Sequence, residues 1–193
     1  MFKTNRQTTY PVHELILNRW SPRAFSNEPL SDQELMSLFE AARWAQNSYN
    51  NQPWAFVYSL KNSDSWQLFL ELLVPANREW AQYAPVLVIA IAKTTFDYNN
   101  KPSRTHSFDV GAACQNMALQ GASLDIIVHG MEGFDYERAK IVAKIPQDYA
   151  VQAMFAVGKI GPKQILSPIL QKRENPSDRK ALHSFVFEDE FKK

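Results

Sequence analysis

Residues 109–135 read Asp-Val-Gly-Ala-Ala-Cys-Gln-Asn-Met-Ala-Leu-Gln-Gly-Ala-Ser-Leu-Asp-Ile-Ile-Val-His-Gly-Met-Glu-Gly-Phe-Asp and predict a helix, a strand and a loop in succession. The predicted helix, Asp109 to Leu124, is rich in small residues. They are Gly111, Ala112, Ala113, Ala118, Gly121 and Ala122. Because small side chains allow close approach, we expect this helix at the centre of the molecule or of a dimer. Asp125 to Val128 is the predicted strand.

Three further strands are predicted on either side of this stretch. A strand is predicted over residues 85–93, because residues 85–92 are continuously apolar and rich in valine and isoleucine, which is typical of a strand covered on both faces. Trp54 to Ser59 also has the composition of a strand. Ala150 to Ile160 is a fourth, which Gly161 and Pro162 close.

Helices are predicted between these strands. Ser31 followed by Glu34 three residues later is a capping-box pattern and predicts the start of a helix. Residues 64–73 have helical apolar spacing, and Pro75 is expected to end that helix. Residues 136–145 predict another helix, so helices and strands alternate along the chain.

The charge of the chain is nearly balanced, with 21 lysines and arginines against 20 aspartates and glutamates and a formal net charge of +1. Binding to a phosphate backbone relies on clustered basic charge. We find no such cluster and expect no nucleic-acid partner. The longest apolar run, Pro85 to Ala92, is far below the ~20 residues that cross a bilayer, so no membrane insertion is expected.

Length and cysteine content narrow the class further. The 193 residues fit one domain spanning residues 1–193. Cys114 is the only cysteine, which excludes an intrachain disulfide and a multi-cysteine metal site and favours a reducing cytoplasm. The histidines lack metal-ligand spacing, and we expect no metal.

The C-terminal part, about residues 163–193, has an irregular pattern interrupted by Pro168 and Pro176. It carries the apolar trio Phe185, Val186 and Phe187 near its end. An extension of this kind cannot bury itself, so its apolar residues need another surface. We expect a partner subunit to supply that surface.

Arg19, Ser21 and Arg23 form the first cluster with chemical potential. In an extended loop, positions two apart project to the same side, so two guanidinium groups and a hydroxyl can converge on one anion such as a phosphate monoester. In the alternative interpretation, the loop is solvated and its arginines pair with nearby acids such as Glu14 or Glu28.

Ser48, Asn50 and Gln52 form a second cluster, directly before a predicted strand. Amide and hydroxyl side chains can satisfy the donors and acceptors of a heterocycle without bringing charge. The alternative is a turn that uses asparagines for left-handed backbone geometry.

Two more segments have binding potential. Residues 129–135 leave a strand and enter a helix, and their two glycines allow the backbone to approach a flat ligand. Residues 176–179, Pro-Ser-Asp-Arg, offer another anion contact through Arg179.

Together, these motifs resemble the nitroreductase family of flavoproteins, in which they occur in the same order. They are Arg-x-Ser-x-Arg-x-Phe from Arg19, Ser-x-Asn-x-Gln-Pro-Trp from Ser48, Glu-Gly-Phe-Asp from Glu132 and Pro-Ser-x-Arg from Pro176. The resemblance extends from Leu17 to about Phe187. It implies a three-layer α+β fold, in which helices flank a mixed sheet of four or five strands, and an intertwined homodimer with FMN at the subunit interface.

The resemblance also implies roles for individual residues. Arg19, Ser21 and Arg179 would hold the phosphate and ribityl side of FMN, with Ser177 in the same motif as Arg179. Arg23 would lie near the pyrimidine edge of the ring, where a cation stabilises the negative charge of the reduced flavin.

Other matching residues would contact the ring itself. Glu132 and Gly133 would donate main-chain N–H groups to flavin N5 and O4, and Asn77 matches an asparagine that contacts the ring. A loop that reaches the flavin of the other subunit is matched by Gln46, Asn47, Ser48 and Asn50.

The function implied by the resemblance is that of an FMN-dependent oxidoreductase. Electrons would pass from NADH or NADPH through flavin N5 to a small organic acceptor, such as a nitroaromatic, a quinone or an enal, by a ping-pong mechanism. One alternative is a specialised relative that reduces a single metabolite, removes a halogen or cleaves the flavin. Another is a non-catalytic protein that binds or stores FMN.

Overall fold

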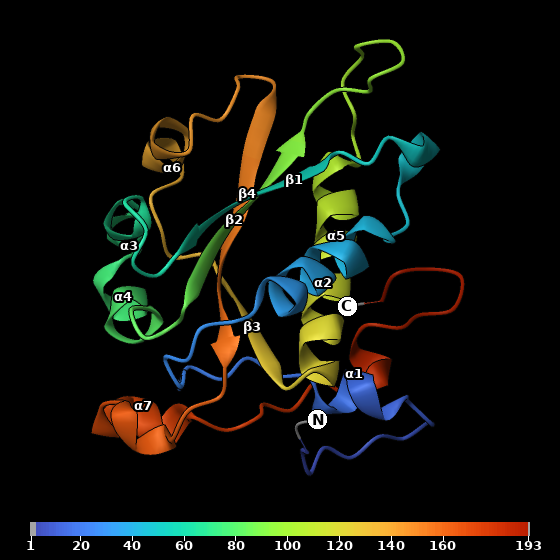
Figure 1. Ribbon diagram of the computed structural model, residues 1–193. Helices are drawn as coiled ribbons and strands as arrows, with labels where there is room; N and C mark the ends of the chain where they lie inside the picture. The colour runs from blue at the N-terminus through green and yellow to red at the C-terminus, as the bar shows by residue number, and fades with distance from the viewer. Residues whose placement is uncertain (1–2, 193) are drawn as a thin grey trace.

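The centre of the fold is an antiparallel sheet, which the computed structural model shows together with the rest of residues 3–192 (Figure 1). Its strands within these residues are β1 (Trp54–Leu60), β2 (Val86–Lys93), β3 (Ile126–Met131) and β4 (Tyr149–Lys159), in the order β1-β2-β4-β3. Val57 lies opposite Ile89 across the β1–β2 pair, and Val88 lies opposite Phe155 across the β2–β4 pair.

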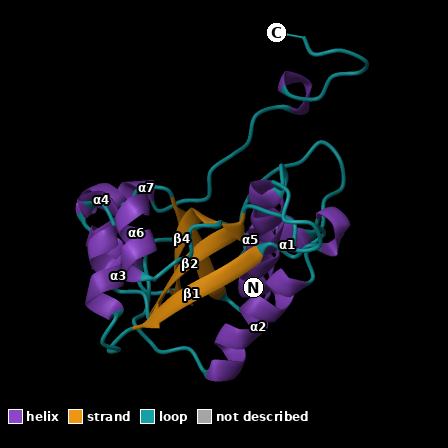
Figure 2. Ribbon diagram, turned by 90° about the horizontal axis from the view of Figure 1, so that it is seen from above, coloured by secondary structure: helices purple, strands orange, loops and turns teal. Residues whose placement is uncertain are grey.

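Helices cover both faces of this sheet and complete three layers (Figure 2). On one face lie α2 (Asp32–Arg43) and α5 (His106–Ser123), and on the other α3 (Trp66–Leu72), α4 (Pro75–Ala81) and α6 (Tyr136–Val142). The remaining helical segments are α1 (Glu14–Asn18), η1 (Ser48–Asn50), η2 (Lys163–Ile165), α7 (Pro168–Arg173) and η3 (Leu182–Ser184). The predicted three-layer α+β class is confirmed.

The sheet has the expected strand number within residues 3–192, but every pairing there is antiparallel, whereas a mixed sheet was expected. The connection through α5 explains the difference. Because β2 and β3 are both antiparallel to β4, they run in the same direction, as strands joined by a crossover helix do. β4 then inserts between them, so these two parallel strands never pair.

β2 separates two apolar layers. Its residues 87, 89 and 91 face the layer under α3, α4 and α6, while residues 86, 88, 90 and 92 face α2 and α5. Successive side chains of a strand point to opposite faces, so a strand covered on both sides must be apolar throughout. The continuous apolar run from 85 to 92 therefore predicted a strand covered on both faces.

Local signals fixed the start of α2 as expected. The Ser31 hydroxyl accepts the N–H of Glu34 at 3.2 Å, and the Glu34 carboxylate accepts the N–H of Ser31 at 2.8 Å. These reciprocal bonds form a capping box and satisfy two N–H groups that a helix start leaves without partners.

The small residues of α5 permit close packing on the sheet. A Cβ atom on Gly121 would lie 2.8 Å from both the carbonyl oxygen of Ile126 and a methyl carbon of Val128. Only glycine fits there without movement of β3, which follows α5 directly in the chain.

Two prolines mark helices that the local patterns did not predict. Pro75 ends α3 as expected, but it also occupies the first turn of α4, where its missing N–H costs no hydrogen bond. Pro168 opens α7 in the same way within the part predicted to be irregular. β3 also extends to Met131, so His129 and Gly130 belong to the strand and not to the loop that follows it.

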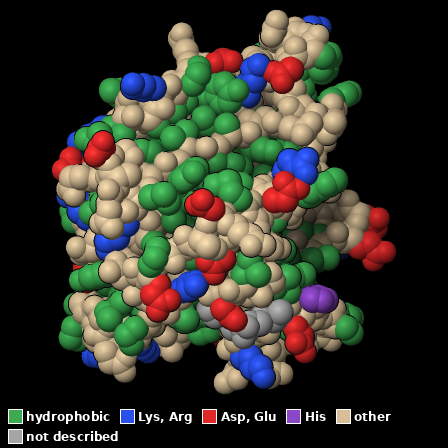
Figure 3. Space-filling model, viewed as in Figure 1, with side chains coloured by type: hydrophobic (Ala, Val, Ile, Leu, Met, Phe, Trp, Pro, Cys, Tyr) green, Lys and Arg blue, Asp and Glu red, His purple; other side chains and the backbone are tan. Residues whose placement is uncertain are grey.

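The C-terminal segment that carries η3 extends away from the body of the chain (Figure 2). Phe185, Val186 and Phe191 in it are 55%, 60% and 76% exposed. Within residues 3–192, no helix has the length and apolar character to cross a membrane. Charged side chains of both signs are interspersed on the face drawn in Figure 3.

Candidate functional site

A cavity of about 240 Å³ brings together segments from both ends of the chain. Three parts of the sequence line it: the N-terminal region, β3, and the end of α7 with the segment that follows it. Among the described residues, the lining side chains are Arg6, Arg19, Trp20, Ser21, Arg23, His129, Arg173, Asn175, Ser177 and Arg179. Half of them are arginines and none is an acid, so the wall favours an anion.

Arg19 is a partly buried member of the predicted anion-binding cluster. Its Nη1 donates to the Ser21 hydroxyl oxygen at 3.4 Å, which confirms that these two side chains converge. Burial lowers the pKa of the Arg19 guanidinium, and repulsion from Arg6 and Arg179 lowers it further. A negative charge in the cavity would relieve this repulsion.

Arg6 joins two of the predicted motifs and was missed by the sequence analysis. Its Nη1 donates to the carbonyl oxygens of Leu17 and Arg19, both at 2.9 Å, and its Nε donates to the carbonyl oxygen of Ser177 at 3.0 Å. Arg6 therefore ties the N-terminal loop to the C-terminal motif. Burial lowers its pKa, and Arg179 adds to this effect while Asp178 opposes it.

Arg23 pairs with an acid that is distant in sequence. Its Nη1 lies 3.6 Å from Oε2 of Glu174, a contact between residues 151 positions apart. Glu14 and Glu28 were the acids considered from the sequence, and neither has this role. The Arg23 side chain is 30% exposed in the cavity wall, whereas the side chain of Glu174 is 5% exposed.

Ser177 and Arg179 form a local turn at the cavity rim. Nη1 of Arg179 lies 3.1 Å from the Ser177 hydroxyl and 3.2 Å from the Ser177 carbonyl oxygen, and it donates to both. The structure therefore places Arg19, Ser21, Arg23, Ser177 and Arg179 around one cavity.

His129 contributes a neutral group to the same wall. Its Nδ1 lies 2.8 Å from the carbonyl oxygen of Pro22, and its ring packs against Trp80 at 4.4 Å between centroids, with the ring planes tilted by 38°. Burial lowers the pKa of His129 to about 4, and the charges of Arg23 and Arg19 act in the same direction. The segment 129–135, which was predicted to approach a flat ligand, thus begins with a buried residue of β3.

Asn77, Glu132 and Gly133 meet beyond the end of β3. The side-chain amide of Asn77 donates to the Gly133 carbonyl oxygen at 3.1 Å, and the N–H of Val74 donates to the same oxygen at 3.1 Å. Within residues 3–192, the N–H of Gly133 has no acceptor. This N–H group is available to a ligand that lies along β3.

The loop from Gln46 to Gln52 is held in a strained conformation. Tyr49, Asn50 and Gln52 have positive φ angles of 54°, 52° and 48°. Asparagine adopts this geometry readily, but tyrosine and glutamine there cost roughly 1–3 kcal/mol each. The left-handed turn considered from the sequence is present, and it extends beyond the asparagines.

Asp109, a buried acid at the start of α5, anchors this loop. It accepts the N–H of Ser48 at 3.2 Å and the hydroxyl of Thr105 at 3.2 Å, and the hydroxyl oxygens of Thr105 and Ser48 lie 2.9 Å apart. Asn47 accepts the N–H of Gln52 at 2.9 Å, so its side chain serves the loop itself. Within residues 3–192, Gln46 and Asn50 form no side-chain hydrogen bond.

The loop and the arginine cavity lie at different ends of α5. Ser48 contacts Asp109 in the first turn of that helix, whereas α1, which leads into Arg19, lies beside the opposite end (Figure 1). One chain does not bring these two groups of predicted residues together.

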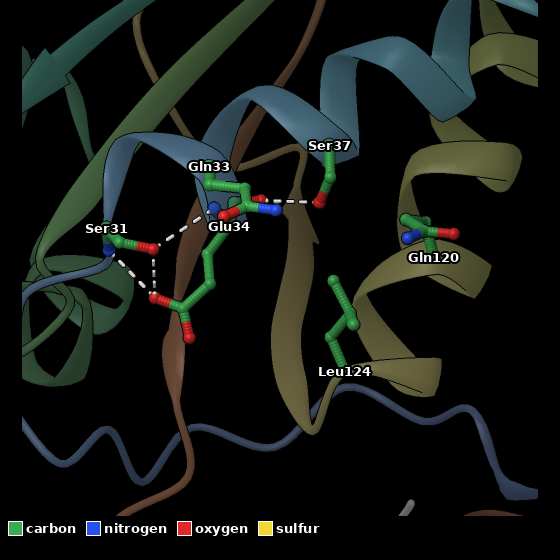
Figure 4. Close-up of a pocket in the computed structure, with 6 residues that line it drawn as sticks. All are labelled: Ser31, Gln33, Glu34, Ser37, Gln120 and Leu124. Carbon is green, nitrogen blue, oxygen red and sulfur yellow. Dashed lines mark hydrogen bonds between the residues drawn. The ribbon is translucent and has the colours of Figure 1, made fainter.

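A second cavity, of about 300 Å³, lies between the start of α2 and the end of α5 (Figure 4). Its wall includes the capping-box pair Ser31 and Glu34, and Glu34 also forms an ion pair with Lys159 at 3.1 Å. The charged group in this wall is therefore already paired, and the cavity has no evident ligand chemistry.

Other reactive groups are not arranged as a site. In the part of the chain that the structure describes, no group of three or more histidines, cysteines, aspartates or glutamates is placed to hold a metal ion. Burial raises the pKa of the Cys114 thiol to about 12, which disfavours the thiolate that a nucleophile requires.

Comparisons with known proteins agree with this fold. A model of the nitroreductase family matches residues 16–159. A solved structure described as an oxidoreductase containing FMN is 42% identical, covers 100% of this chain and 98% of its own, and superposes with a TM-score of 0.94. A nitroreductase family protein from Streptococcus pneumoniae TIGR4 is 19% identical, with 91% and 98% coverage and a TM-score of 0.73, which is a likeness of fold alone.

Relatives were also found by sequence, and two of them follow. Protein DrgA of Synechocystis is 28% identical over 177 residues, which cover 76% of this chain and 82% of that protein. A Rhodopseudomonas palustris protein, provisionally named an NADH dehydrogenase/NAD(P)H nitroreductase, is 24% identical over 144 residues, which cover 65% and 72% of the two chains.

Proposed function

This chain belongs to the nitroreductase family, and we propose that it binds FMN and transfers electrons from NADH or NADPH to a small organic acceptor. The observation that carries the proposal is the convergence of Arg19, Ser21, Arg23 and Arg179 on one acid-free cavity. FMN ends in a phosphate monoester, the anion that such a wall suits best.

The residues present fit the phosphate end of FMN. Arg19 is partly buried among like charges, and a dianion would replace that repulsion with attraction. Ser21 and Ser177 supply hydroxyl donors in the same wall. The cavity is slightly smaller than the ~300 Å³ at which typical ligand pockets begin. We infer that the ring extends beyond this cavity.

The residues after β3 suit the ring end. His129 lies in the cavity wall and Gly133 lies four positions further along the chain. We propose that the N–H groups of Glu132 and Gly133 donate to the ring, with Asn77 beside them. Asn77 holds the Gly133 carbonyl oxygen, so it positions this segment even without touching a ligand.

Bound FMN would supply the redox chemistry, by taking electrons from NAD(P)H and giving them to an acceptor in a ping-pong sequence. The protein's own residues bind and orient. Arg19, Ser21 and Arg179 hold the phosphate side, while the Arg23 cation favours the negative charge of the reduced cofactor. His129 remains neutral at physiological pH, so the positive charge of the wall comes from the arginines.

We propose that the complete site needs a second copy of the chain. The Gln46–Gln52 loop lies at the other end of α5 from the arginine cavity, so in one chain it cannot reach a ligand held there. The C-terminal segment, about residues 163–193, ends in exposed apolar residues that require another surface. In a homodimer, Gln46, Ser48 and Asn50 of one subunit would complete the site of the other.

Spectroscopy of the purified protein tests the proposal. We expect a yellow protein with tightly held FMN, whose visible flavin absorbance bleaches on anaerobic addition of NADH or NADPH and returns when a quinone or nitroaromatic is added. Arg19→Ala should lose FMN on gel filtration. Arg138→Ala, which removes a surface arginine paired with Glu71 on another face, should retain it.

The possible outcomes separate the alternatives. A protein that binds FMN but does not bleach with either nicotinamide would be a binding or storage protein. Bleaching followed by reoxidation with only one class of acceptor would indicate a specialised reductase. A colourless protein that takes up no FMN would contradict the proposal.

A further inference from the structure

Glu174 lies buried behind the cavity wall and contacts Arg23 in two ways. Its Oε1 accepts the main-chain N–H groups of Arg23 at 2.6 Å and of Ala24 at 3.0 Å, while its Oε2 lies 3.6 Å from the Arg23 guanidinium. We propose that Glu174 is a positioning residue, which fixes the Arg23 segment and offsets the Arg23 charge, and thereby lowers the redox potential of the cofactor. This inference rests on the proposed function.

The placement of Glu174 is costly, which argues for a role beyond packing. Its Oε2 is fully buried and has no hydrogen-bond partner among the described residues. A buried carboxylate oxygen without a donor carries a desolvation penalty that an apolar side chain would avoid. The two N–H contacts occupy only Oε1, so they do not explain why a charged group is present.

The main-chain contacts show how Glu174 sets the position of Arg23. They come from consecutive N–H groups of the segment that lines the cavity, and the acceptor follows directly after α7. A helix end thus fixes the backbone from which the Arg23 side chain projects. Residues 173 and 175, on either side of Glu174, line the same cavity, so this contact joins two walls of the site.

The ion pair shows how Glu174 changes the effect of Arg23. A cation with a counter-ion 3.6 Å away exerts a weaker field on a third group than a lone cation does. Because Glu174 is buried, solvent screens its charge poorly. The reduced cofactor should therefore be stabilised less by the Arg23–Glu174 pair than by Arg23 alone.

Glu174→Gln separates charge from position. A glutamine carbonyl oxygen can still accept both N–H groups, but the negative charge is gone. The protein with FMN bound would be titrated anaerobically to its midpoint potential, and the dissociation constant of oxidised FMN would be measured separately. We expect the ratio of reduced to oxidised affinity to rise about tenfold, which corresponds to a midpoint potential about 30 mV higher for a two-electron couple. The affinity for oxidised FMN should change less than threefold.

Two further variants test whether Glu174 acts through Arg23. In an Arg23→Ala background, Glu174→Gln should shift the midpoint potential by less than half the shift seen in the wild-type background. The reason is that the Arg23 cation, whose charge Glu174 offsets, is absent. Glu174→Asp keeps the charge but withdraws it by one methylene, and should raise the potential by a smaller amount. If Glu174→Gln does not fold, Glu174→Asp tests the same inference. Glu137→Gln, an exposed acid on α6 paired with Lys140, is the matched control and should leave the potential unchanged.

The results also distinguish the two proposals. If the wild-type protein binds FMN and the potential of Glu174→Gln and Glu174→Asp is unchanged or lower, this inference is overturned while the proposed function stands. An equal shift in the wild-type and Arg23→Ala backgrounds would overturn the role through Arg23. If the wild-type protein takes up no FMN, both proposals fail.

Discussion

The Nδ1 atom of His129 lies 2.8 Å from the carbonyl oxygen of Pro22, so a strand residue is fastened to the loop that carries the predicted anion-binding motif. A carbonyl oxygen only accepts, so the neutral ring carries its proton on Nδ1. Burial lowers the pKa of His129 from 6.5 to about 4, with Arg23 and Arg19 contributing and the bond to Pro22 opposing. The folded protein therefore favours the neutral ring.

This pKa shift makes stability depend on pH. The unfolded chain binds a proton at His129 below about pH 6.5, whereas the folded chain resists it until about pH 4. The neutral His129 ring therefore makes its full contribution to the free energy of unfolding above pH 6.5. This contribution of about 3 kcal/mol is lost as the pH falls toward 4. Urea unfolding of the FMN-free protein at pH 7.0, 5.5 and 4.5 would measure it. In His129→Gln, the amide can still donate to Pro22, but this part of the pH dependence should be lost. If the free energy of unfolding varies with pH equally in both proteins, His129 is not the group responsible.

Arg6, Arg19 and Arg179 should make the FMN-free protein a phosphate binder. Their mutual repulsion contributes to the lowered pKa of Arg19, and a bound anion relieves it. Inorganic phosphate at ten times its dissociation constant should stabilise the protein by about 1.4 kcal/mol. Thermal unfolding with phosphate and with chloride at equal ionic strength would show the difference. Arg19→Gln should abolish the phosphate effect and Arg138→Gln should keep it; equal effects of the two salts would argue against a specific site.

The fold was predictable where the information is local. The apolar run of β2 and the reciprocal Ser31–Glu34 pattern each specify their own conformation within a few residues. Pro75 was harder, because the same residue that ends α3 also suits the first turn of α4. The antiparallel order was not predictable from local patterns, because the place of β4 between β2 and β3 depends on contacts between strands that are distant in sequence.

The candidate site shows the same division. Arg19, Ser21 and Arg23 were identified because their spacing within one loop indicates a shared target. Glu174 was missed because its partner is 151 positions away and its own neighbourhood is an ordinary charged helix end. Arg6 was missed because it donates to main-chain carbonyl oxygens. Every residue type carries such an oxygen, so these contacts leave no pattern in the sequence.

Gly133 should tolerate a side chain only if Asn77 gives way. A Cβ atom there would lie 2.8 Å from Nδ2 of Asn77 and 2.9 Å from a methyl carbon of Val74. Gly133→Ala should therefore destabilise the protein by about 1–3 kcal/mol, and the bulkier Gly133→Val should also exclude FMN by crowding the backbone. Urea unfolding of Gly133→Ala, Asn77→Ala and the double variant would measure their coupling. The double variant should be more stable than the sum of the single effects predicts by at least about 0.5 kcal/mol. Strict additivity would count against the contact with Asn77 as the cause of the destabilisation. A normally yellow Gly133→Val protein would count against the place of Gly133 beside FMN.

Removal of residues 185–193 should weaken the proposed dimer without unfolding the subunit. Phe185, Val186 and Phe191 are more than half exposed, and full burial of one such side chain against a partner contributes about 1.5–3 kcal/mol. The truncated protein should therefore dissociate at concentrations at least ten times higher than the full chain. Light scattering over a dilution series would measure this, with thermal unfolding as the check on folding. Ile141→Ser, which removes an apolar side chain that is 77% exposed on α6, is the control and should leave the dimer intact. A truncated protein that remains dimeric at the same dilution as the full chain would mean that the segment binds no partner subunit.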